Sequence, residues 1–159
     1  MPCDTIYGFV GICPGTGERI QNIKGREDDK PLLVLTNLDN ITNLTEQKIP
    51  EKFTRCWPGP LTLIVKKKGT DETIAVRVPD DQILLKLIAR LGSPLYSTSV
   101  NRSGEPPLND IEVIVEEFEN DVDLIIDGGN IERGVPSTIV DVTTRPFKII
   151  REGKLKIEL

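Results

Sequence analysis

The stretch Pro94-Leu95-Tyr96-Ser97-Thr98-Ser99-Val100-Asn101-Arg102-Ser103-Gly104-Glu105-Pro106 places small hydroxyl and amide side chains between a strand-like start and a proline exit. Hydroxyls and amides can donate and accept hydrogen bonds, and Gly104 lets the backbone turn where a larger residue would clash. This composition is typical of a polar loop that holds a ligand. Runs of Ser, Thr and Asn are also typical of plain turns, so the stretch alone leaves both interpretations open.

The sequence around this loop alternates between strand-like and helical patterns. Apolar residues follow the helical period over 81–91 and 110–119, after natural N-caps at 80 or 81 and at 109 or 110. A shorter amphipathic helix is expected around Ile20 and Ile23. The mixture predicts an α/β sheet covered by helices, with a hairpin near the C-terminus. The predicted strands, rich in β-branched and aliphatic residues, are 6–11, 32–36, 61–66, 74–78, 95–99, 122–127, 138–142 and 147–151.

The length and composition are those of one globular domain. The 159 residues suffice to bury one core, so we expect a single domain over 1–159. The sequence has neither a long apolar run nor a signal-peptide pattern, which predicts a soluble, cytoplasmic protein that does not contact a membrane. Cys3, Cys13 and Cys56 lack metal-ligand spacing, so we expect reduced thiols and no protein-bound metal.

The chain contains no histidine. This excludes Ser-His-Asp and Cys-His catalysis and the commonest nitrogen ligand of zinc or iron. The net charge of −5, from 20 basic and 25 acidic residues, argues against the broad basic surface of a non-specific nucleic-acid binder. Any chemistry must therefore use arginine, lysine, hydroxyl, amide or carboxylate groups.

A cluster of cations follows the short helix. Lys24-Gly25-Arg26 and then Lys30 precede an apolar strand. Arginine offers a planar fork and lysine a compact charge, a combination that suits a polyphosphate and a leaving pyrophosphate. The alternative is a helix whose last turn carries basic residues that complement its dipole. No Walker-type glycine-rich loop is present, so the chain is not a P-loop ATPase.

Further polar residues lie at the ends of predicted strands, where α/β sheets place ligand groups. They form the segments 4–8 and 137–141. Arg77 and Arg151 are flanked by apolar residues, and each guanidinium is expected to pair with a carboxylate of the protein or of a ligand, the first being the commoner outcome. The segment 57–62, Trp-Pro-Gly-Pro-Leu-Thr, predicts a rigid turn that holds the single tryptophan against the core.

Seven segments occur in the order and approximate spacing of the YrdC/TsaC family, which the chain resembles over nearly its whole length. The family makes L-threonylcarbamoyladenylate, the activated intermediate that modifies the adenosine beside the anticodon of tRNAs reading codons that start with A. The resemblance implies a twisted, open, mixed sheet with a concave, positively charged cleft. The segments are Asp4-Thr5-Ile6-Tyr7-Gly8, Lys24-Gly25-Arg26 with Lys30-Pro31-Leu32, Trp57-Pro58-Gly59-Pro60-Leu61-Thr62, Val76-Arg77-Val78-Pro79, Ser97 to Gly104, Pro136 to Asp141 and Ile150-Arg151-Glu152-Gly153.

The resemblance also implies roles for individual residues. Lys24 and Arg26 match the family's Lys-x-Arg pair, and Ser99 and Asn101 match its Ser-x-Asn pair; both pairs would face ATP and its Mg²⁺ as catalytic and nucleotide-binding groups. The remaining implied contacts are Thr5 and Tyr7 near the substrate amino acid, Arg77 at the threonine carboxylate, Thr98, Ser137 and Thr138 as further substrate contacts, and Arg151 at the nucleotide.

The implied reaction needs charge neutralisation and alignment rather than a protein nucleophile, so Ser99 is expected to bind and not to attack. Threonine and bicarbonate would form N-carboxythreonine, which attacks the α-phosphate of ATP. The implied partners are other tRNA threonylcarbamoylation proteins. Two alternatives are a non-catalytic module that binds double-stranded RNA or tRNA, and carbamoyl-adenylate chemistry like that of the hydrogenase-maturation domain of similar fold.

The chain departs from the family pattern at its start. Members usually carry a helix and a strand ahead of the Asp-Thr motif, whereas here Met1-Pro2-Cys3 begins inside it, with Cys3 where threonine is usual. The domain is therefore expected to be N-terminally shortened. An unpaired sheet edge invites association, so a partner or a second copy in a homodimer is expected to cover it.

Overall fold

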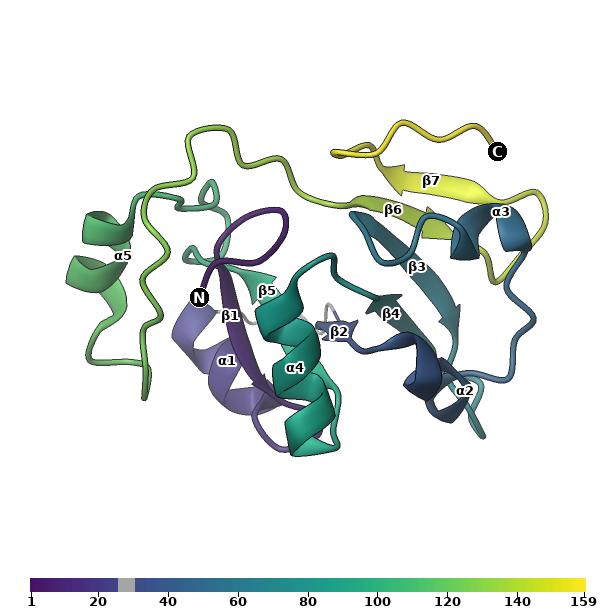
Figure 1. The fold of residues 1–159 in the computed structure, drawn as a ribbon, viewed down its shortest axis with the longest axis horizontal. Helices are drawn as coiled ribbons and strands as arrows, with labels where there is room; N and C mark the ends of the chain where they lie inside the picture. Colours follow the sequence, from purple (N-terminus) through teal and green to yellow (C-terminus); the bar gives the residue numbers. More distant parts are fainter. Residues whose placement is uncertain (26–30) are drawn as a thin grey trace.

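The computed structural model describes residues 1–25 and 31–159, and seven strands in these residues form one sheet (Figure 1). The strand order is β1-β5-β2-β4-β3-β6-β7. The pairs β2–β4 and β3–β6 are parallel and the others antiparallel, so the predicted mixed α/β sheet and its C-terminal hairpin are confirmed. The strands are β1 (Gly8–Ile12), β2 (Leu33–Leu35), β3 (Leu61–Lys66), β4 (Thr73–Arg77), β5 (Leu95–Ser99), β6 (Thr138–Asp141) and β7 (Lys148–Arg151).

Two of the helices begin at the caps that the sequence offers. The side chain of Asp81 accepts hydrogen bonds from the amides of residues 83 and 84, and that of Asp110 from residues 112 and 113. Each cap satisfies amides that have no partner inside the helix. The helices are α1 (Gly17–Lys24), the 3₁₀ turn η1 (Leu38–Asn40), α2 (Ile41–Leu44), α3 (Glu51–Thr54), α4 (Gln82–Leu91) and α5 (Ile111–Phe118).

One face of the sheet is covered along its length. Side chains alternate between the two faces of a strand, and Val34, Val76 and Val140 all point to this face. They pack with Phe53 of α3 and with Trp57, whose Nε1 donates to the Leu61 carbonyl at 2.6 Å. The predicted tryptophan turn is therefore buried in the main core.

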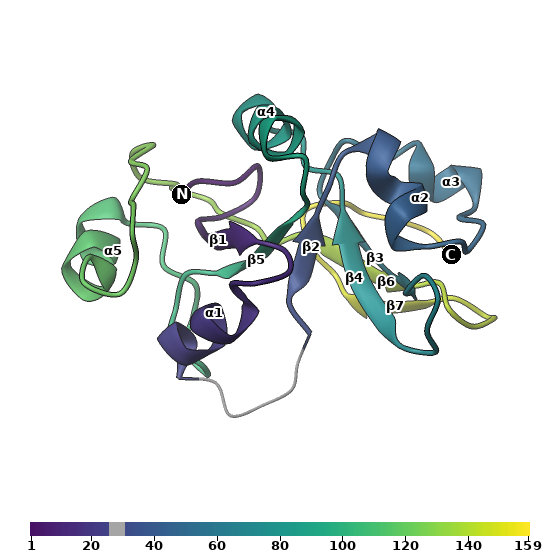
Figure 2. The same cartoon turned by 90° about the horizontal axis from the view of Figure 1, so that it is seen from below.

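At the β1 end of the same sheet, α1 and α5 supply the cover (Figure 2). Phe9 of β1 meets Phe118 of α5 edge to face, with ring centroids 4.9 Å apart. Ile20 of α1 and Ile114 of α5 complete this second cluster.

The opposite face is only partly covered. Leu84 and Ile88 of α4 are fully buried against Leu35 of β2 and Leu95 of β5. Figure 1 shows α4 in front of the β1, β5 and β2 side of the sheet, away from β6 and β7. The polar side chains of β3, β4 and β7 that share this face are therefore not covered by α4.

One predicted strand is absent. Residues 122–127 are apolar and β-branched, yet they form no ladder within the described chain. Val122 packs against the cluster around Phe118, whereas Leu124 is 74% exposed. An apolar run forms a strand only where a neighbouring strand accepts its backbone hydrogen bonds, and here the chain crosses from α5 toward β6 as an irregular segment.

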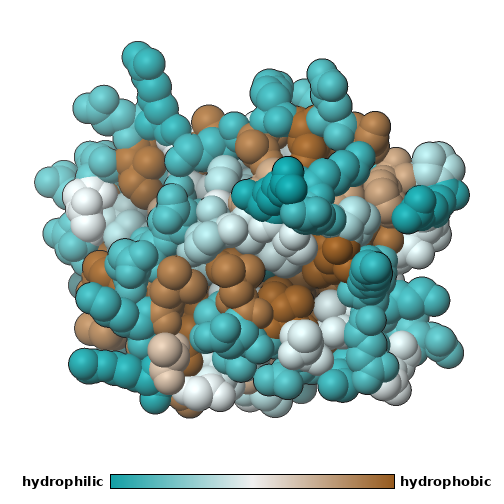
Figure 3. Space-filling model, turned by 45° about the vertical axis from the view of Figure 1, so that its right-hand side comes forward, coloured by the Kyte–Doolittle hydropathy of each residue, from teal (hydrophilic) through white to brown (hydrophobic). Residues whose placement is uncertain are grey.

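The surface mixes charged residues with scattered apolar patches, as one face of the molecule shows (Figure 3). Ile83 and Leu91 of α4 are 62% and 43% exposed. Among the described residues, no helix is long and apolar enough to cross a membrane. The three cysteines are free thiols, as the sequence predicts.

Candidate functional site

The uncovered part of the α4 face is a polar cleft of about 230 Å³. Strand register brings its walls together, because Leu33 pairs with both Ala75 and Ser97, while Ile139 pairs with Thr62 and Arg151. The polar residues that line it are Thr5, Thr62, Arg77, Ser97, Thr98, Ser99, Ser137 and Arg151. Eight residues from six strands or their flanks thus line one space.

The N-terminal segment closes one side of this cleft. A Cβ added at Gly8 would lie 3.0 Å from Ser97 Oγ and 3.1 Å from Cys3 Sγ, so only glycine fits there without a shift of its neighbours. Cys3 lines the cleft and is 8% exposed. Burial raises the pKa of its thiol, against the opposing attraction of the Arg77 charge.

Arg77 ends β4 and has an internal carboxylate partner. Its side chain is 3% exposed, Nη2 lies 3.0 Å from Asp4 Oδ1, and Nη1 donates to Thr5 Oγ1 at 3.2 Å. Of the two alternatives that the sequence left open, a carboxylate of the protein is present. Nε has no hydrogen-bond partner among the described residues, and a buried donor without an acceptor is costly. The contacts with Asp4 and Thr5 therefore fix the orientation of Arg77, and its Nε remains as a donor without an acceptor among the described residues.

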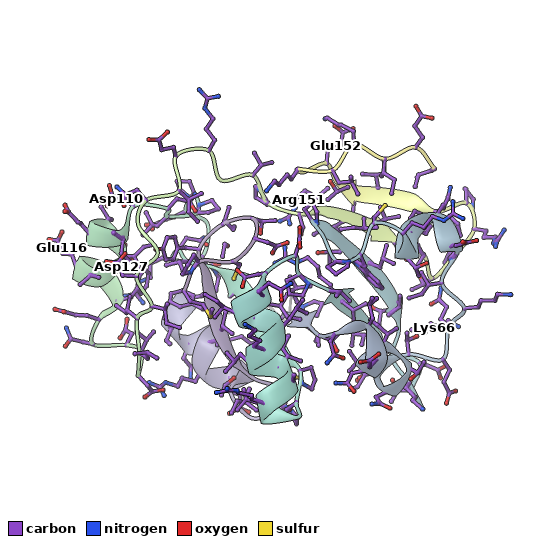
Figure 4. All side chains as sticks on the ribbon, in the orientation of Figure 1. Lys66, Asp110, Glu116, Asp127, Arg151 and Glu152 are labelled. Carbon is purple, nitrogen blue, oxygen red and sulfur yellow. The ribbon has the colours of Figure 1, made fainter. Side chains whose placement is uncertain are left out.

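Arg151 ends β7 and is held by the loop before β6. Its Nε donates to the Ser137 carbonyl at 3.1 Å, and its Nη2 donates to the same carbonyl at 2.9 Å and to Ser137 Oγ at 3.2 Å. Burial lowers the pKa of Arg151, and the nearby charge of Arg77 lowers it further. Figure 4 shows Arg151 at the end of β7, with Glu152 beyond it. Two guanidiniums that repel each other across one cleft favour an anion between them.

The end of β5 carries a tight network around Asn101. Ser99 Oγ donates to Asn101 Oδ1 at 2.6 Å, and Asn101 Nδ2 donates to the carbonyls of Arg102 and Glu105. Lys24 Nζ donates to Asn101 Oδ1 and to the carbonyls of Ser99 and Asn101, at 2.8 to 3.0 Å. The Lys-x-Arg and Ser-x-Asn motifs of the sequence are thus in contact through Lys24, which is 5% exposed.

The loop that follows has the turn that its composition predicts. Gly104 has φ of +87°, a left-handed conformation that favours glycine. The ligand-loop and plain-turn interpretations of this stretch therefore both apply, the first to Ser97–Ser99 in the cleft and the second to the residues after Asn101.

Two predicted contacts are engaged in the protein scaffold. Tyr7 is fully buried; its hydroxyl donates to the Gly129 carbonyl and accepts from the Gly128 amide, each at 2.9 Å. Thr138 Oγ1 accepts from the amides of Gly153 and Leu155 and donates to the Leu155 carbonyl. The Tyr7 phenol thus fixes the irregular segment before β6, and the Thr138 hydroxyl fixes the C-terminal segment.

Arg26 and Lys30 lie outside the described residues, so the structure says nothing of their predicted phosphate contacts. Sequence reasoning missed three residues of the cleft region: Asp4, Thr62 and Ser97. Each belongs to a segment that stood out in the sequence, and strand alternation would have placed Thr62 and Ser97 on the cleft face.

A second cavity, of about 340 Å³, lies beside β1 and α5 and is lined almost entirely by apolar side chains, with Arg19 and Asp123 at its rim. Its walls carry no cluster of polar groups suited to chemistry, so the polar cleft is the candidate site. Within the described ranges, no group of three Cys, Asp or Glu residues is placed to hold a metal ion.

Comparison with known proteins places this cleft in a family. The model of the Sua5/YciO/YrdC domain, described as telomere recombination, matches residues 1–153. The chain belongs to the Sua5/YciO/YrdC family. The resemblance inferred from the seven sequence motifs is therefore confirmed.

Relatives of this family align along nearly all of the chain. A threonylcarbamoyl-AMP synthase of Pyrococcus abyssi is 35% identical over 173 residues, which cover 99% of this chain and 51% of that protein. A threonylcarbamoyl-AMP synthase of Vibrio vulnificus is 32% identical over 171 residues, covering 96% of this chain and 89% of the relative. The chain thus spans about half the length of the archaeal relative.

The fold agrees as well. The crystal structure of P. abyssi Sua5 complexed with L-threonine superposes with a TM-score of 0.85 at 35% identity, over 97% of this chain and 49% of that one. The sheet and helices described above thus share the fold of the aligned part of Sua5.

Proposed function

We propose that the cleft binds Mg²⁺-ATP, L-threonine and bicarbonate and forms L-threonylcarbamoyladenylate and pyrophosphate. The observation that carries this proposal is the convergence of Arg77 and Arg151 on one cleft lined by hydroxyl groups. All three substrates carry anionic oxygens, which accept hydrogen bonds from guanidiniums and hydroxyls. Relatives named threonylcarbamoyl-AMP synthase, at 32–35% identity, support the same activity.

The reaction proceeds in two bond-forming steps. The threonine amine attacks the carbon of bicarbonate, a C–N bond forms and water leaves, which gives N-carboxythreonine. An oxygen of the new carboxylate then attacks the α-phosphorus of ATP. The bond between the α-phosphorus and the bridging oxygen breaks, and pyrophosphate leaves with the electron pair. Both steps need alignment and charge stabilisation rather than a histidine base, in keeping with the composition of the chain.

The residues of the cleft divide between the substrates. Arg77, oriented by Asp4 and Thr5, faces the threonine carboxylate, and its buried Nε supplies the donor that the protein leaves without an acceptor. Ser99 and Asn101, at the C-terminal end of β5, contact ATP, and Lys24 fixes this segment by donating hydrogen bonds to their carbonyls. We further propose that Arg26 approaches the phosphates and that Mg²⁺ enters with ATP.

The product is a mixed anhydride of a carbamate and AMP, and such anhydrides react readily with amines. We propose that other tRNA threonylcarbamoylation proteins receive it and transfer its threonylcarbamoyl group to the amine of adenosine. The chain itself supplies the activation step.

Pyrophosphate release tests the proposal. Release from Mg²⁺-ATP should require both threonine and bicarbonate, and Arg151→Met should reduce it at least about 100-fold, since a charged donor at the reacting phosphates contributes roughly 3 kcal/mol. Arg90→Met, an exposed arginine in the last turn of α4, is the matched control and should keep the wild-type rate. Release that is independent of threonine, or no release by the wild type, would overturn the assignment.

A further inference from the structure

A buried hydroxyl beneath the cleft has no role in the assignment above. Thr62, the second residue of β3, is 1% exposed and lines the floor of the cleft. Its Oγ1 lies 2.8 Å from Ser137 Oγ, and either oxygen can be the donor at this distance. The direction of this one hydrogen bond decides what Ser137 offers to a ligand.

The direction follows from the requirement that buried donors be satisfied. Among the hydrogen bonds of the described residues, Ser137 Oγ is the sole partner of Thr62 Oγ1. If Ser137 donated, the hydroxyl hydrogen of Thr62 would be buried without an acceptor. If Thr62 donates, its hydrogen is satisfied, and the Ser137 hydrogen is left for the cleft that Ser137 lines. In the second arrangement the unpaired hydrogen belongs to Ser137, which is 3% exposed but lines the cleft, where a ligand can accept it.

Arg151 removes the remaining freedom of Ser137. Its Nη2 donates to Ser137 Oγ at 3.2 Å, so this oxygen then accepts two hydrogen bonds, one from Arg151 and one from Thr62. With both lone pairs used, the hydroxyl of Ser137 can act only as a donor. A donor that points into the cleft beside a guanidinium is suited to an oxygen that only accepts.

The charge of the neighbourhood supports this arrangement. Arg151 also donates twice to the Ser137 carbonyl, and its Nη1 takes part in none of the hydrogen bonds within the described ranges. The Ser137 hydroxyl and the free edge of the guanidinium therefore form two adjacent donors. Such a pair is complementary to a carboxylate or a phosphate.

We infer that Thr62 is a positioning residue, which orients the Ser137 hydroxyl as a donor and so completes, with Arg151, a subsite for the acceptor oxygens of a carboxylate or phosphate. This inference rests on the proposed function for the identity of the substrates, ATP and threonine. The subsite itself depends only on the hydrogen-bond geometry, so it should also take inorganic phosphate.

The test is calorimetric titration of Mg²⁺-ATP, L-threonine and inorganic phosphate into the wild type, Thr62→Val and Thr62→Ser. Valine keeps the shape of threonine and removes the hydroxyl. The Thr62→Val substitution should lower the affinity for phosphate and for at least one substrate about tenfold, the loss expected for one hydrogen bond to a charged group. Serine keeps the hydroxyl and should restore affinity to within about twofold. Thr36→Val, a fully buried threonine outside the cleft, controls for the placement of an apolar group.

A double-mutant cycle separates positioning from general loosening. Ser137→Ala should cost as much affinity as Thr62→Val, and the double variant should lose no more than either single variant, because Thr62 acts through Ser137. Additive losses, an equal loss in Thr62→Ser, or wild-type affinity in Thr62→Val would overturn the inference.

The outcomes also distinguish this inference from the proposed function. If the wild type binds phosphate in a Thr62-dependent manner but releases no pyrophosphate, the proposed synthase activity is rejected and the positioning role of Thr62 is kept. If pyrophosphate release depends on threonine and is unchanged in Thr62→Val, the synthase activity is kept and the positioning role of Thr62 is rejected. A wild type that binds none of the three ligands would overturn the subsite.

Discussion

A substitution of Lys24 gives the sharpest test of what stabilises the segment 99–101 at the C-terminal end of β5. Within residues 1–25 and 31–159, its ammonium donates three hydrogen bonds of 2.8 to 3.0 Å, two to backbone carbonyls and one to Asn101 Oδ1, and its side chain is almost fully buried. Lys24→Met keeps the length of the side chain and removes the charge and all three donors. If Lys24 holds this loop, the substitution must destabilise the fold, and not only weaken the binding of ATP.

The magnitude follows from the contacts. Hydrogen bonds to charged groups contribute about 1.5–3 kcal/mol each. The hydrogen bond to the Ser99 carbonyl is only partly buried, and without Lys24 the Asn101 Oδ1 atom still accepts a hydrogen bond from Ser99 Oγ. The three contributions therefore do not simply add. We expect a loss of about 3 kcal/mol in the free energy of unfolding, at the lower end of the range for breaking a buried charged contact. For a chain of this size, that lowers the unfolding midpoint by roughly 6–12 °C.

The assay is thermal unfolding followed by circular dichroism, with ATP titrated separately. Lys86→Met, an exposed lysine on α4, is the matched control; it should leave the midpoint within about 2 °C, since lysine and methionine have similar helix propensities. A Lys24→Met protein of wild-type stability that has lost ATP affinity would refute the reasoning and make Lys24 a phosphate contact alone.

Three further predictions follow from other contacts. A side-chain hydrogen bond between Tyr96 and Cys13, together with burial, raises the pKa of Tyr96 to about 12. The folding stability should therefore be full below pH 10 and should fall as the pH rises through 12. In urea unfolding, the Tyr96→Phe variant should lose this part of the decline in stability. Thr138→Val should speed amide hydrogen exchange at Leu155 by at least about fivefold, and equal exchange would show that its hydroxyl bonds are dispensable. Asp110→Ala removes the cap of α5 and should cost about 1 kcal/mol in urea unfolding, against no change for the exposed Asp71→Ala.

Much of the fold could be read from local patterns. The helices α4 and α5 begin directly after Asp81 and Asp110 because aspartate caps the first turn, and apolar periodicity fixes their inner faces. The turns α2 and α3 escaped prediction because four residues are too few to show a helical period. Residues 122–127 look like a strand in the sequence, since composition does not reveal whether a partner strand is available.

The sequence predicted which residues lie at the site, but not which of them face a ligand and which are bonded within the protein. The motifs brought Arg77, Arg151, Ser99 and Ser137 to one cleft, as the strand ends implied. Whether a polar side chain faces a ligand or the scaffold depends on tertiary contacts that no local pattern encodes. The Tyr7 hydroxyl is thus engaged by the segment before β6, 121 and 122 residues later in the chain.

The proposed activity of this cleft is the joining of threonine, bicarbonate and ATP into one product. The most direct measurement is mass spectrometry of the reaction run with ¹³C-bicarbonate. We expect threonylcarbamoyl-AMP that carries one ¹³C, formed only when threonine is present and lost in Asn101→Ala. AMP and pyrophosphate without a labelled adduct, in a reaction quenched within seconds, would contradict it.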